Sequence, residues 1–167
     1  GLTNAGIPLE PLLMGKGANF DPMKLNWIGS PDRDTTICVA RNDAPVKSMN
    51  DLMTRELVVG ASGSGGNTNI YPMFFANMIG MKFKVIKGYN GTREILLAIE
   101  RGEVMGMCSD HDPLTQQPMF REGKLRILFQ ASMTRDPHID APVPTPFITS
   151  DAQRKATELF LARQDLG

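Results

Sequence analysis

The sequence lacks any long hydrophobic run. No apolar stretch approaches the ~20 residues that a membrane-spanning helix needs, and the longest, from Ile95 to Ile99, lies in an amphipathic pattern. We therefore expect no direct membrane insertion. The chain begins at Gly1 and shows neither the basic leader nor the apolar core of a signal peptide. This absence is compatible with export, because a mature or excised chain would look the same.

The sequence also carries no net charge. The 18 basic and 18 acidic residues cancel, which leaves a formal net charge of +0 at pH 7. A nucleic-acid partner or an anionic membrane surface would call for a broad positive face, which this balance does not provide. We therefore predict no nucleic-acid partner.

Cysteine, histidine and the larger aromatic residues are scarce. Both cysteines, Cys38 and Cys108, lie in apolar strand-like runs, so buried free thiols are the favoured interpretation and a bridge between neighbouring strands is the alternative. The two histidines, His111 and His138, lie in polar loops with no evident partner to orient them. Eleven methionines against two tyrosines and one tryptophan indicate an adaptable core, and we predict no cofactor.

What is present is an alternation of strand and helix patterns. Strands are predicted at residues 36–40, 57–60, 83–86, 104–108 and 125–129, with a short apolar stretch at 27–29. Five helices are predicted. The first begins at Ser48, the second ends at Gly80, and the others cover residues 92–101, 113–123 and about 150–163. Parallel neighbouring strands need crossover helices, so this order predicts an α/β fold with a mostly parallel sheet and helices on both faces.

The loop over residues 60–68 carries the most information about function. Its four glycines and two serines stand just ahead of a helix, where backbone N–H groups and the positive helix end can hold an anion. A turn that needs glycine only for its geometry explains the pattern equally well. In parallel sheets ligands bind at the carboxyl ends of strands, which here lead into the loops 61–68, 88–91 and 109–112.

Other chemistries fit this loop less well. Thr68 stands where a dinucleotide fingerprint needs its third glycine, and no Gly-Lys-Ser/Thr follows for a phosphate loop. Ser62 is followed two residues later by Ser64, where a nucleophile elbow needs glycine. Residues 110–112 superficially resemble metal ligands, but Asp112 before a proline is better explained as a helix cap, and we predict no metal site.

Several short motifs occur in an order and spacing typical of one family. They are Phe-Asp-Pro at 20–22, Trp-Ile-Gly-Ser at 27–30, the strand and capped helix through 52, Gly-Ala-Ser-Gly-Ser-Gly at 60–65, Lys-Gly-Tyr-Asn-Gly at 87–91, Glu-Val-Met-Gly at 103–106, Gly-Lys-Leu-Arg at 123–126, and the aspartate- and proline-rich stretch 140–146. With these motifs the chain resembles, over nearly its whole length, the receptor proteins of tripartite tricarboxylate transporters, the Bug-type periplasmic solute-binding proteins. The resemblance implies a periplasmic-binding-protein-like (type II) fold. Such receptors have two α/β lobes that close on a small carboxylate like a Venus flytrap.

The resemblance also implies which residues bind the ligand. In the family, backbone groups of two strand-to-helix loops hold the carboxylate, and here those loops are residues 62–68 and 88–92. The implied ligand-binding residues are Ser62, Gly63, Ser64, Gly65, Gly66, Asn67, Thr68, Gly88, Tyr89, Asn90, Gly91, Thr92 and Asp110. The family often has a histidine where Asn69 stands. Its implied partners are a small carboxylate and membrane transporter subunits, and its implied location is the periplasm.

The chain matches only the central part of the family pattern. The family's opening strand with its glycine-rich turn, and its closing segment, have no counterpart here. We therefore predict that residues 1–34 are the tail of a first lobe and a connection. Residues 35–132 would form the ligand-gripping lobe with crossing strands, and residues 133–167 a return segment toward the first lobe.

The leading hypothesis is thus a fragment of an extracytoplasmic receptor that captures a small carboxylate and catalyses nothing. The alternative is a small α/β enzyme or regulatory domain whose loop at residues 60–68 holds a phosphorylated or acyl ligand. A third hypothesis is an interaction domain without a small ligand. No compelling catalytic base stands close to the loop in the sequence, which favours the binding hypothesis.

Overall fold

The computed structural model describes residues 35–162, together with Asp21, Lys24 and Asn26. The expected apolar stretch at residues 27–29 and the last residues of the chain lie outside this part. Within it, the five predicted strands are all found. In chain order the elements are β1 (Thr36–Arg41), η4 (Asn50–Met53), β2 (Leu57–Ala61), α2 (Asn67–Ile79), β3 (Phe83–Lys87), α3 (Thr92–Arg101), β4 (Gly106–Asp110), α4 (His111–Thr115), α5 (Pro118–Arg121), β5 (Leu125–Gln130), η5 (Thr145–Phe147) and α6 (Asp151–Leu161).

Two helix predictions need correction. The helix expected from Ser48 is a single 3₁₀ turn, whose Asp51 carboxylate accepts hydrogen bonds from the amides of Lys47 and Ser48. The helix expected between Pro113 and Gly123 is split into α4 and α5, because Pro118 lacks an N–H and opens a new helix at its first position. Asp112 was expected to cap this helix, but Asp110 occupies the N-cap position.

The strands form one five-stranded sheet in the order β3-β2-β4-β1-β5. β2 is parallel to β3 and to β4, whereas β1 is antiparallel to β4 and to β5. The sheet is therefore mixed rather than mostly parallel. The predicted arrangement of β2, β3 and β4 is confirmed, since their carboxyl ends share one edge. The antiparallel β1 brings its amino end, Thr36, to that same edge, opposite Asp110.

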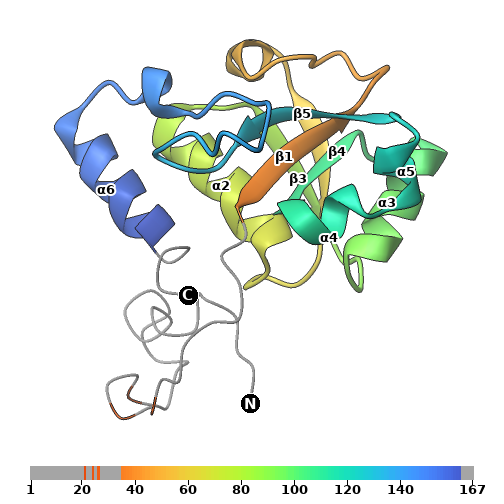
Figure 1. Ribbon diagram of the computed structural model, residues 1–167, viewed down its shortest axis with the longest axis horizontal. Helices are drawn as coiled ribbons and strands as arrows, with labels where there is room; N and C mark the ends of the chain where they lie inside the picture. The colour runs from red at the N-terminus through yellow and green to blue at the C-terminus, as the bar shows by residue number, and fades with distance from the viewer. Residues whose placement is uncertain (1–20, 22–23, 25, 27–34, 163–167) are drawn as a thin grey trace.

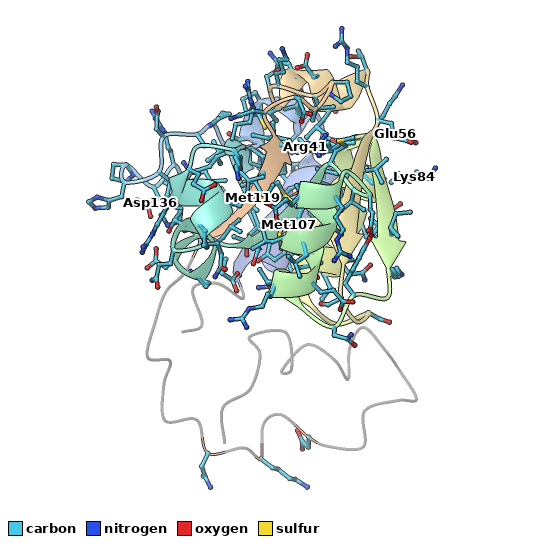
Figure 2. All side chains as sticks on the ribbon, turned by 90° about the vertical axis from the view of Figure 1, so that its right-hand side faces the viewer. Arg41, Glu56, Lys84, Met107, Met119 and Asp136 are labelled. Atoms are coloured by element: carbon cyan, nitrogen blue, oxygen red, sulfur yellow. A yellow bond between two sulfur atoms is a disulfide. The ribbon has the colours of Figure 1, made fainter. Side chains whose placement is uncertain are left out.

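Helices cover both faces of the sheet, as predicted. Figure 1 shows α2 and α6 on one side and α3, α4 and α5 on the other. Alternate residues of β1 enter two separate cores: Cys38 packs with the α2 and α6 side, and Ile37 with the α3 and α4 side. Met107 of β4 is fully buried in the second core, whereas Lys84 of the edge strand β3 is exposed at the periphery (Figure 2).

A disulfide joins Cys38 of β1 to Cys108 of β4, so the expectation of free thiols was wrong. The two residues are direct partners in the antiparallel register, with their Cα atoms 4.0 Å apart. Both face the same core, which places their sulfur atoms together. The interstrand bridge, the alternative considered from the sequence, is the correct one.

Helix α6 begins where the sequence predicts. Ser150 and Gln153 form a capping box, in which each side chain accepts from the other residue's backbone N–H. The Nε2 of Gln153 also donates to the carbonyl of Met78 at 2.7 Å, which fixes α6 against the end of α2. None of the described helices combines the length and the apolar character required to cross a bilayer.

Candidate functional site

The loop between β2 and α2 is an ordered turn closed at its base. The hydroxyl of Thr68 accepts from the backbone N–H of Ser62 at 3.0 Å, and the two hydroxyl oxygens lie 2.9 Å apart. The amide of Gly66 donates to the carbonyl of Gly63 at 3.1 Å. The first two contacts join Ser62, the residue after β2, to the first turn of α2, and the third closes the loop on itself, so the loop presents its backbone in one defined shape.

The amino end of α2 has no side-chain cap. Its N-cap residue is Gly66, and the first turn contains no acidic residue. The amides of the first residues of a helix lack partners within the helix, and the helix dipole adds positive potential there. This 13-residue helix therefore offers an anion both N–H donors and a favourable field at the sheet edge.

The glycines of this loop have different roles. None of Gly63, Gly65 and Gly66 has a positive φ, so left-handed backbone does not explain them. A Cβ added at Gly66 would lie 2.8 Å from the Oγ of Ser62, whereas a Cβ at Gly63 or Gly65 would meet no atom within 4 Å. A side chain at residue 66 would therefore have to displace the Ser62 hydroxyl, whereas Gly65 faces open space.

The loop between β3 and α3 lies beside the first one. The amide of Tyr89 donates to the carbonyl of Ala61 at 3.4 Å, which continues the pairing of β2 with β3. Gly88 has a φ of 115°, a backbone conformation that favours glycine. The amide of Asn90 donates to the carboxylate of Glu94 at 2.6 Å, so the start of α3 already has an acidic partner. Of these two helices, only α2 has no acidic residue in its own first turn.

Tyr89 is the aromatic residue of this second loop. Burial raises the pKa of its phenol, and the charges of Glu103 and Glu94 raise this pKa further. Its ring lies close to the end of β2, because a Cβ added at Gly60 would come within 3.3 Å of it.

Asp110, at the end of β4, connects the sheet to the α2 loop. Its Oδ1 accepts from the hydroxyl of Thr36 at 2.9 Å and from the Nδ2 of Asn67 at 2.8 Å. Although Asp110 is the N-cap residue of α4, its side chain does not cap that helix. The carboxylate is instead turned toward β1 and the first turn of α2.

The structure thus brings the predicted site residues to one edge of the sheet. Direct bonds join Ser62 to Thr68 and Asn67 to Asp110, and the second loop is attached through Tyr89. Thr36 was not predicted, because only the antiparallel register places it beside Asp110. Within the described part of the chain, no group of three or more His, Cys, Asp or Glu side chains is arranged to hold a metal ion.

Asn69 is a second residue that the sequence did not assign to the site. It lies in the first turn of α2, is only 6% exposed, and its Nδ2 donates to the carbonyl of Ser64 at 2.8 Å. Its Oδ1 is buried and has no hydrogen-bond partner among the described residues. A buried oxygen of this kind costs about 1–3 kcal/mol unless it finds a donor, so it marks the loop as incomplete without a guest molecule or water.

Comparison with known proteins identifies the fold through structure rather than sequence. The chain matches no protein-family model. It also matches no curated protein sequence. Solved structures do match: Rpa4515 of R. palustris with adipate superimposes with a TM-score of 0.59 at 19% identity, over 77% of this chain and 50% of that one. The chain has the fold of one lobe of a TctC/Bug-type solute-binding protein.

Two further structures agree with this assignment of the fold. MatC (Rpa3494) from Rhodopseudomonas palustris with bound malate has a TM-score of 0.58 at 17% identity, over 96% of this chain and 60% of that one. A TctC solute binding protein from Polaromonas has a TM-score of 0.55 at 17% identity, over 79% of this chain and 51% of that one. The resemblance noted from the sequence is therefore confirmed at the level of fold. The chain spans 50–60% of the length of these three structures.

Proposed function

We propose that this chain forms the ligand-gripping lobe of an extracytoplasmic solute receptor that captures a small carboxylate. The observation that carries the proposal is the uncapped amino end of α2 at the sheet edge, beneath a loop of defined shape. A carboxylate there would accept from the backbone N–H groups of the loop and of the first helical turn. The solved neighbours hold adipate and malate, which favours a small dicarboxylate as the ligand class.

The proposed binding set extends over both loops. Backbone groups of residues 62–68 would hold the carboxylate, residues 88–92 would border it, and Asp110 would face the same space. Tyr89 would belong to this border, since the bond from its amide to the carbonyl of Ala61 holds the second loop beside the first. In an intact receptor, a second lobe would close over this edge and exclude water.

Location and partners follow from the same proposal. The Cys38–Cys108 disulfide favours an oxidising compartment, which for a receptor of this fold is the periplasm. Membrane subunits of a tripartite tricarboxylate-type transporter would receive the loaded protein. Catalysis finds less support: in the described part of the chain the hydroxyl of Ser62 pairs with that of Thr68 instead of a base.

Substitution of Gly65 tests whether the anion binds at this loop. Gly65→Val is expected to weaken carboxylate binding at least ~10-fold, or about 1.4 kcal/mol, because its side chain would fill the open space above the loop. The fold should survive, since the φ of Gly65 is not positive and its added Cβ meets no atom. Titration with malate and succinate, followed by loop amide shifts in NMR spectra, measures the effect.

Ser64→Ala is the matched control for this experiment. It removes an exposed hydroxyl and leaves every backbone amide in place, so binding should change by no more than ~0.5–1.5 kcal/mol. If Gly65→Val binds as tightly as the parent, the backbone cradle at this loop is the wrong mechanism.

The affinity of this chain alone is expected to be weak. A single lobe leaves one side of the ligand in water, so we expect a dissociation constant of roughly millimolar, or about 4 kcal/mol of binding free energy. Calorimetry of the 167-residue chain with malate, succinate and adipate provides the measurement. Submicromolar binding of any of these acids would show that the site is complete within this chain and lies elsewhere.

A further inference from the structure

The carboxylate of Asp110 has one oxygen occupied and one available. Its Oδ1 accepts from both Thr36 and Asn67, and the described residues place no hydrogen-bond donor on its Oδ2. Thr36 is 1% exposed, whereas Asp110 is only partly buried. One side of the carboxylate is therefore fixed from within the fold, and the other remains able to accept a hydrogen bond from outside it.

A second acceptor at the same loop points to the same kind of guest. The Oδ1 of Asn69 is buried and unpartnered, while the Nδ2 of the same side chain is held by Ser64 at 2.8 Å. Buried acceptors nearly always have a donor, from protein, ligand or ordered water. The edge of the sheet thus combines a helix end that attracts anions with one buried acceptor that lacks a donor and one partly exposed carboxylate oxygen that can accept from a ligand.

These two features conflict for an unsubstituted carboxylate. The Oδ1 of Asp110 accepts a hydrogen bond at 2.8 Å from the side chain of Asn67, the first residue of α2. A carboxylate placed at that helix end would meet the like charge of Asp110 in a partly desolvated position, which is unfavourable. A hydroxyl or ammonium group between the two carboxylates removes the conflict, because it donates to Asp110 and, if cationic, also neutralises it.

We infer that the ligand is a carboxylate bearing a hydrogen-bond donor, hydroxyl or ammonium, on the carbon next to the bound carboxylate, and that Asp110 receives this donor. The inference rests on the proposed carboxylate site and narrows its ligand class. It predicts tighter binding of acids that carry this donor than of unsubstituted dicarboxylic acids of the same length. The buried Oδ1 of Asn69 would accept from a water bound within the loop.

The charge of Asp110 separates this role from a purely structural one. If Asp110 only fixed the α2 loop to β1, an asparagine would serve as well, because its Oδ1 can accept from Thr36 and Asn67 in the same way. Asp110→Asn therefore keeps the volume and the two internal bonds but removes the charge. Its effect on ligand preference, rather than on overall affinity, is the decisive readout.

The test compares succinate, malate and aspartate, which share a four-carbon diacid skeleton and differ at one carbon by hydrogen, hydroxyl or ammonium. Each is titrated into the 167-residue chain at fixed pH and ionic strength, and backbone amide shifts of residues 62–69 and 110 give the dissociation constants. We expect malate, aspartate or both to bind at least ~10-fold more tightly than succinate, the ratio typical of one charge-assisted hydrogen bond. Which of the two is preferred identifies the donor.

In the Asp110→Asn variant, the dissociation constants of malate and aspartate are expected to come within ~3-fold of that of succinate. In the Thr36→Val variant, which keeps the charge of Asp110, the order of the three acids should persist.

Equal binding of the three acids by the parent overturns the inference, and so does a preference that survives Asp110→Asn. If instead no acid shifts the loop amides, the carboxylate site itself is wrong and the inference falls with it. Binding of succinate alone would support the site and overturn the inference.

Discussion

Removing the Cys38–Cys108 disulfide is expected to lower the free energy of unfolding by about 4 kcal/mol. The bond closes a loop with a sequence separation of 70 residues. In the chain-entropy description, a cross-link of this span restricts the unfolded state by ~4 kcal/mol relative to the open chain. Urea denaturation of the parent and of the double variant Cys38→Ala/Cys108→Ala measures the difference.

Reductant provides the matched control for this prediction. It should destabilise the parent by a similar amount and leave the double variant unchanged, because only the parent has a bond to reduce. A loss below ~1 kcal/mol in both experiments would mean that the bridge does not constrain the unfolded chain as this span requires. Since Asp110 follows Cys108 by two residues and Thr36 precedes Cys38 by two, the bond also holds the β1–β4 register on which the Thr36–Asp110 contact depends.

Gly106→Ala is expected to be the most damaging single-methyl substitution among the described glycines. Its added Cβ would lie 2.3 Å from the carbonyl oxygen of Val39 and 3.3 Å from the Cα of Ala40. Both atoms belong to the backbone of β1, so relief requires the central strands to separate. We expect a loss of about 3 kcal/mol in the free energy of unfolding, measured by urea denaturation.

Gly63→Ala is the control for this substitution. Its Cβ would meet no atom within 4 Å and its φ is not positive, so the change should stay within ~0.5 kcal/mol. A Gly106→Ala protein as stable as the parent would contradict the close approach of β1 and β4. The same variant should lose carboxylate binding only in proportion to its unfolded fraction, since Gly106 lies at the opposite end of β4 from Asp110.

The sequence alone determined the five strands, the three longer helices and the place of the two glycine loops. β-branched and apolar runs are read correctly as strands because their signal is local, and the same holds for α6, whose capping box begins at Ser150. The same local signal predicts the glycine-rich loop ahead of α2 as a candidate anion site, alongside a turn that needs glycine only for its geometry. Parallel strands joined by crossovers then required the carboxyl ends of β2, β3 and β4 to share an edge, and they do. The loop expected at residues 109–112 was wrong, because β4 extends to Asp110 and α4 follows it directly.

Only the tertiary structure decided how β1 joins the sheet, and this choice shaped the site. The strand runs antiparallel between β4 and β5, a direction that its own residues do not encode. Register sets which residues become partners across strands, and no local periodicity contains it. That register pairs Cys38 with Cys108, residues 70 positions apart, and brings Thr36 to Asp110. The burial of Asn69 likewise depends on packing around α2, because the same amide in an exposed turn would be satisfied by water.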